Sequence, residues 1–115
     1  MPRSRLTSYL ATYRQKAALT QRELGELLGL TNAAVSGYER EVSPVSARVL
    51  IACQLIFGVE AAALFPALVD EVEDELGARI VALLKQLDGR TDRASRKKRD
   101  VLLAVPERIR KAAYE

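Results

Sequence analysis

The sequence predicts an all-α protein, with a five-helix domain at residues 6–65 and a helical extension at residues 66–115. Apolar residues recur at steps of three and four along most of the 115 residues. No stretch alternates apolar and polar residues in the way a half-buried strand does. Gly29, Gly58 and Pro66 punctuate the periodic segments, where helices are expected to end or begin.

The first two helices are expected at residues 6–17 and from Thr20 to about residue 28. The hydroxyl of Thr20 can cap the second helix, and Glu23 three residues later completes a capping box. Gly29 ends this helix because glycine adopts the left-handed conformation at little cost. The apolar face of the second helix is predicted to consist of Leu24, Leu27 and Leu28.

Thr31 can cap a third helix that runs to about Tyr38, with Val35 and Tyr38 pointing inward. A fourth helix is expected to start at Ser43 and Pro44, with Ser46 as a rival cap, and to stop at Gly58. A short fifth helix is expected at residues 60–64.

The extension begins with a long amphipathic helix of about 20 residues. The polar run DGRTDRAS at residues 88–95 predicts a turn. Residues 95–115 indicate a further helix that Pro106 breaks or restarts, since proline removes a backbone donor. The apolar stripe of the long helix, a predicted dimerisation surface, consists of Val69, Val72, Leu76, Ile80, Leu83, Leu84 and Leu87.

Composition argues against several functional classes. The chain has no histidine and a single cysteine, Cys53, which we interpret as a small core residue. An internal disulfide is therefore excluded, and we predict no catalytic residue, no metal site and no cofactor. No apolar run approaches the roughly 18 residues needed to span a bilayer, and the N-terminus lacks the pattern of a leader peptide. We expect a cytoplasmic protein that is not an enzyme.

A very short turn separates the second and third predicted helices. Only Gly29, Leu30 and Thr31 lie between them. Such a turn makes the second helix of a pair cross the first steeply and project from the surface. The major groove of DNA, about 12 Å wide, admits one α-helix. The pair is therefore interpreted as a helix-turn-helix over residues 20–39.

The segment from about Tyr9 to Leu64 resembles the phage repressor and Cro family, also called the XRE family. The resemblance lies in YRQKAALTQRELGELLGL, in AAVSGYER, and in Pro44 with LIACQLIFGVEAAALF. It implies a five-helix domain, DNA binding and dimers on palindromic operators. The chain has Gly25 where the family usually has alanine, and Glu41 where it often has glycine. The acidic Glu41 side chain would repel nearby phosphates.

The third predicted helix carries no lysine or glutamate between Thr31 and Tyr38, although solvated helix faces usually carry both. Small uncharged side chains let a helix approach base edges, and the Asn32 amide can pair with adenine. Candidate base-reading residues are Thr31, Asn32, Ala33, Ser36 and Gly37. Candidate phosphate contacts are Thr20, Gln21, Arg22, Arg40 and Arg48. The resemblance also implies a structural ion pair between Arg14 and Glu39.

Two functions follow from these observations. The first is a sequence-specific transcriptional regulator, a repressor that binds double-stranded DNA as a homodimer. The second is an antitoxin or adaptor whose C-terminal helices bind a partner protein. The extension either folds back on its own core or dimerises. The net charge of +3 is unevenly distributed, because residues 88–115 hold nine basic and five acidic side chains. The RKKR run at residues 96–99 is predicted to be solvated, to pair with acidic residues, or to contact phosphates.

Overall fold

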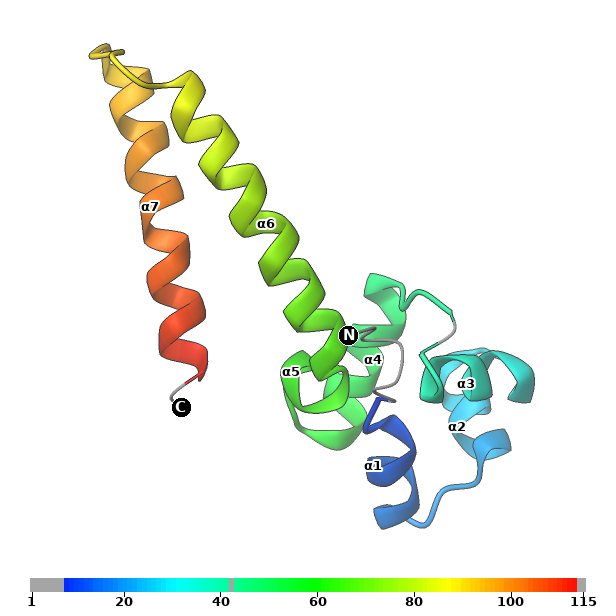
Figure 1. Ribbon diagram of the computed structural model, residues 1–115. Coiled ribbons are helices and arrows are strands. Elements are labelled where there is room, and N and C mark those ends of the chain that lie inside the picture. The colour runs from blue at the N-terminus through cyan, green and yellow to red at the C-terminus, as the bar shows by residue number, and fades with distance from the viewer. Residues whose placement is uncertain (1–7, 42, 114–115) are drawn as a thin grey trace. The chain divides into compact units, whose positions relative to one another are not determined.

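The computed structural model describes residues 8–41 and 43–113, and this part of the chain is entirely helical between its turns, with no strand (Figure 1). The predicted all-α fold is confirmed. The predicted start of the first domain at residue 6 lies outside the described residues. The helices are α1 (Leu10–Lys16), α2 (Gln21–Leu28), α3 (Asn32–Glu39), α4 (Ala47–Phe57), α5 (Ala61–Leu64), α6 (Pro66–Gln86) and α7 (Arg93–Ala113).

The chain divides into two compact units between Asp70 and Glu71, a boundary that lies inside α6. The first unit contains α1 to α5 with the first turn of α6. The second contains the rest of α6, the turn that follows it, and α7.

Side-chain caps start the helices of the first unit where short polar residues precede apolar ones. The Thr20 hydroxyl accepts from the Glu23 amide at 3.0 Å, and the Glu23 carboxylate accepts from the Thr20 amide at 2.9 Å, so the predicted capping box is formed. Thr31 caps α3 by accepting from the Ala34 amide at 3.1 Å.

The predicted start of the fourth helix at Ser43 is wrong, because the rival Ser46 caps α4. The Ser46 hydroxyl accepts from the Val49 amide at 3.2 Å, and Ser46 itself has extended backbone angles. A hydroxyl can reach the third amide of a helix only from the residue just before the first turn. Ser43 lies three residues too early to do so.

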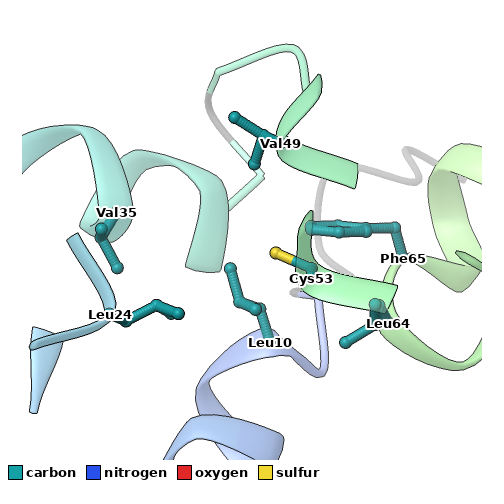
Figure 2. Packing of buried hydrophobic residues seen from close by; sticks show 7 residues of the cluster. All are labelled: Leu10, Leu24, Val35, Val49, Cys53, Leu64 and Phe65. Carbon is teal, nitrogen blue, oxygen red and sulfur yellow. The ribbon is translucent and has the colours of Figure 1, made fainter. Parts of the chain in front are cut away.

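The core of the first unit gathers apolar side chains from α1 to α5 and the residue that follows α5. Figure 2 shows them converging: Leu10, Leu24, Val35, Val49, Cys53, Leu64 and Phe65. Cys53 is fully buried, as the sequence predicts, and burial raises the pKa of its thiol to about 11. The inward position predicted for Leu27 is wrong, since 58% of this residue is exposed. Leu24 and Leu28 lie one turn apart on the core side of α2, and Leu27 lies about 60° from Leu24 on the side away from Leu28.

The second unit is a helical hairpin. Helices α6 and α7 run in opposite directions from the turn at residues 87–92 (Figure 1). Asp92 precedes α7, and its carboxylate accepts from the Ser95 amide at 3.1 Å and from the Ser95 hydroxyl at 2.7 Å. These hydrogen bonds lower the pKa of Asp92.

The predicted break of the last helix at Pro106 is wrong, because α7 continues through this residue to Ala113. Proline removes one backbone donor, and the flanking turns of a long helix keep their own hydrogen bonds.

Candidate nucleic-acid interface

The turn between α2 and α3 fixes the angle between these two helices. Gly29 adopts a φ of 71°, in the left-handed region that glycine favours. The Leu30 amide then donates to the Gly25 carbonyl at 2.8 Å, which closes the turn on the last part of α2. Helix α3 packs chiefly against α2 and also against α1, so its orientation is set by the rest of the unit.

Gly25 is required by a close backbone contact. A Cβ atom at this position would lie 2.7 Å from the Leu30 carbonyl oxygen and 3.5 Å from Cγ2 of Val35. The glycine costs up to about 1 kcal/mol in helix propensity relative to alanine. In return the turn approaches α2 more closely than a side chain at this position allows.

An ion pair and an amide hold the C-terminal end of α3. Nε of Arg14 donates to Oε2 of Glu39 at 2.5 Å, and the two residues are only 12% and 7% exposed. A second donor of the guanidinium reaches the Leu19 carbonyl at 2.9 Å. The Gln21 amide donates to Oε1 of Glu39 at 2.9 Å. Glu39 therefore joins α1, the start of α2 and the end of α3 through one carboxylate.

Ser8 contributes an anchor that sequence reasoning missed. Its buried hydroxyl donates to the carbonyls of Tyr38 and Glu39, each at 3.1 Å. These carbonyls belong to the last turn of α3, where the usual helical partners are lacking; the Tyr38 carbonyl also accepts from the Glu41 amide at 3.2 Å. A serine near the N-terminus carries no local signal for such a role, since its partners lie about 30 residues later in the chain.

The N-terminal part of α3 presents small uncharged side chains. Thr31, Asn32 and Ala33 are exposed, and Ser36 is partly exposed one turn beyond Asn32. The expectation that Gly37 faces outward is wrong, because this residue is buried. Gly37 lies about 40° beyond Ala33 around the helix, toward the side of α3 that packs on the rest of the first unit.

Three exposed arginines lie before or after these residues in the chain: Arg22, Arg40 and Arg48. Arg22 is 81% exposed in α2, where it lies 3.6 Å from Glu26. Arg40 ends α3, Arg48 lies in the first turn of α4, and both are exposed. Thr20 is also exposed and its hydroxyl is committed to the cap. Gln21 is partly buried, and one amide hydrogen is committed to Glu39.

Glu41 follows α3 in a conformation that explains why the family often has glycine at this place. Its φ is 55°, in the left-handed region that side chains other than glycine rarely adopt. Glu41 is partly buried.

The residues of the predicted dimerisation stripe do not form one surface. Ile80 and Leu87 are buried at 5% and 2% exposure, and Leu84 is partly buried. Val72, Leu76 and Leu83 are exposed. Val69 is partly buried and belongs to the first unit. The single stripe expected from the sequence is therefore two stripes with different surroundings.

Residues 10–64 match a helix-turn-helix family. This match identifies the segment as a helix-turn-helix domain, in agreement with the resemblance to the phage repressor and Cro type, the XRE family. Comparisons with curated proteins and with solved structures give no significant match. Among the described residues, no helix has the length and apolar character needed to cross a membrane.

Proposed function

We propose that the protein is a repressor that binds a palindromic operator as a homodimer, with α3 of each copy in the major groove. Residues 6–65 would form the DNA-binding domain and residues 66–115 the dimerising extension. The observation that carries the proposal is the exposed, uncharged N-terminal surface of α3, formed by Thr31, Asn32 and Ala33. Side chains of this size let the helix backbone approach the floor of the groove.

Base reading is assigned to Asn32, Ala33 and Ser36, with Thr31 at the helix start. The Asn32 amide can donate to and accept from one adenine, and the Ala33 methyl can touch a thymine methyl. Gly37 leaves this set because it is buried.

Phosphate contacts are assigned to Arg40 and Arg48, and then to Arg22, Thr20 and Gln21. Gln21 begins α2, and the backbone amides at the start of a helix lack carbonyl partners within it, so a phosphate at this position would meet the N-terminal end of the helix. The Arg14–Glu39 pair has a structural role in this proposal, because both residues are nearly buried and bond to each other.

Two copies related by a twofold axis would place their α3 helices about 34 Å apart, one turn of DNA, and thus select palindromic half-sites. A dimer seated on such a site excludes other proteins from the same DNA. Repression is the direct consequence of this exclusion.

Selection of bound sequences from a random DNA pool tests the proposal. We expect enrichment of inverted repeats whose half-sites are centred about 10 base pairs apart. Enrichment of a single unrepeated site would contradict the dimeric mode. Absence of any enriched sequence would contradict sequence-specific binding.

Variants on the selected operator separate base from phosphate contacts. Asn32→Ala is expected to cost about 1–3 kcal/mol of binding free energy and to relax preference at one position of each half-site. Gln15→Ala removes an exposed amide from α1 and serves as the control. Arg40→Gln is expected to weaken binding to all sequences and to reduce the salt slope by about 1 per contact. Its control is Arg110→Gln, which removes an exposed arginine from α7.

A further inference from the structure

Helix α6 carries two adjacent apolar stripes in the second unit. The first contains Ile80, Leu84 and Leu87, which are buried or partly buried in the hairpin. The second contains Val72, Leu76 and Leu83, which are 53%, 40% and 39% exposed. The members of the exposed stripe fall within about 40° of one another, and the centre of the stripe lies about 70° from that of the buried one. Side chains on this stripe remain uncovered in the single chain.

Helix α7 repeats this arrangement. Ser95 is buried and Leu102 is partly buried, whereas Ala94 and Val101 are exposed about 90° away. Leu83 lines one apolar groove of about 400 Å³ together with Ala94, Lys97, Lys98, Val101 and Leu102. The exposed stripes of the two helices therefore meet on one side of the hairpin. We call this side the hairpin face and define it by Val72, Leu76, Leu83, Ala94 and Val101.

The two ends of the hairpin differ in the sign of their net charge. The start of its α6 portion carries Glu71, Glu73, Asp74 and Glu75. The start of α7, beside the turn, carries Arg93, Arg96, Lys97 and Lys98. Lys97 and Lys98 line one groove with Leu83. Glu75 lies eight residues before Leu83, which is about 12 Å away along α6. The last part of α7 returns to the level of this acidic segment and carries Glu107, Arg108, Arg110 and Lys111, so these two segments together have a net charge of −2, while the segment beside the turn is basic.

We propose that the hairpin face packs on the same face of a second copy, with the two hairpins antiparallel in a four-helix bundle. The proposal rests on the homodimer of the proposed function and names its surface and orientation. The argument for a second copy is charge complementarity, since an antiparallel copy brings the acidic segment of each hairpin over the basic segment of the other. A parallel copy would place ends with the same sign of net charge together.

The spacing of the exposed stripe supports an antiparallel register. Val72, Leu76, Arg79 and Leu83 follow one another at steps of four, three and four, the pattern of a coiled-coil seam. A twofold axis between Gly77 and Ala78 places Val72 against Leu83 of the second copy. The same axis places Leu76 against the aliphatic part of Arg79 of the second copy. Lys97 and Lys98 of the second copy, which lie beside its Leu83, are then level with Glu71 and Glu75 along the bundle.

The apolar part of the interface is tested by Leu83→Glu in the full chain, with Val81→Glu as the matched control. Both residues are exposed, and Val81 lies on the opposite side of α6 from the hairpin face. Sedimentation equilibrium should give a wild-type mass of twice the 12.7 kDa chain. Leu83→Glu should raise the dissociation constant of the dimer by about a hundredfold, since two carboxylates enter an apolar seam. Circular dichroism should show both variants as helical as the wild type.

The orientation is tested by exchanging charges. The double variant Lys97→Glu/Lys98→Glu and the double variant Glu71→Lys/Glu75→Lys should each weaken the dimer by about tenfold, because each sets like charges against one another. A chain that combines all four substitutions restores opposite charges only in the antiparallel arrangement. Recovery of the wild-type dissociation constant in this chain is the expected result.

The results that overturn the proposal are distinct from those that overturn the proposed function. A wild-type chain that stays monomeric up to its solubility limit, or a dimer that Leu83→Glu leaves intact, overturns the hairpin face as a dimer surface. Failure of the fourfold variant to recover overturns the antiparallel orientation. These measurements contain no DNA, so inverted repeats in the selection would still support operator binding by a dimer formed elsewhere.

Discussion

Gly25→Ala should destabilise the protein even though alanine is the better helix former. In the interior of α2 the change in helix propensity alone would stabilise the fold by about 1 kcal/mol. The new Cβ, however, would lie 2.7 Å from the Leu30 carbonyl oxygen, whereas ordinary contacts begin at 3.4 Å. The turn must therefore move by the difference, about 0.7 Å. Overpacking of this kind costs about 1–3 kcal/mol.

Movement of the turn also weakens the bond from the Leu30 amide to the Gly25 carbonyl, now 2.8 Å long, which contributes about 1 kcal/mol. The net expectation is a loss of about 1–3 kcal/mol in the free energy of unfolding. Urea denaturation followed by circular dichroism measures this loss. Gly77→Ala is the control, because nothing lies within 4 Å of a Cβ built at Gly77 in α6. That variant should be stabilised by up to about 1 kcal/mol. If both variants gain stability equally, the contact at Leu30 does not constrain the turn.

Three further predictions concern the first unit. A double-mutant cycle of Arg14→Met and Glu39→Gln tests the ion pair. Each single variant should lose about 3 kcal/mol in the free energy of unfolding and the double variant little more, because either change alone leaves a nearly buried polar partner. Additive losses would contradict this. Ala18→Gly should raise the free energy of unfolding by about 0.5–1 kcal/mol, because Ala18 has a φ of 59° in the left-handed region that glycine favours. Thermal unfolding measures this gain, and an unchanged stability would show that this conformation carries no strain. Burial raises the pKa of the Cys53 thiol from 9.0 to about 11, so the unfolded chain ionises first and stability should fall as pH rises from 9 to 11. Cys53→Ala should flatten that part of the stability profile.

The sequence by itself determined the features that depend on neighbouring residues. The capping box of Thr20 and Glu23, the left-handed turn at Gly29 and the burial of Cys53 all follow from short-range patterns. A hydroxyl that caps a helix acts within three residues, and an apolar stripe shows its period within two turns. The helix-turn-helix therefore follows from the sequence alone.

Tertiary structure decided the features that depend on residues distant in the chain. Ser8 contacts the end of α3 about 30 residues later, and Arg99 donates from α7 to the carbonyls of Leu87 and Arg90 at the end of α6. This use of Arg99 is absent from the alternatives that the RKKR run predicted, since the position of a backbone carbonyl in the folded chain leaves no mark in the sequence. Leu83 and Leu84 are adjacent residues of the same type, yet Leu84 is partly buried and Leu83 is exposed. A periodic pattern identifies apolar residues, and only the packing of α7 on α6 determines which of them still need a partner.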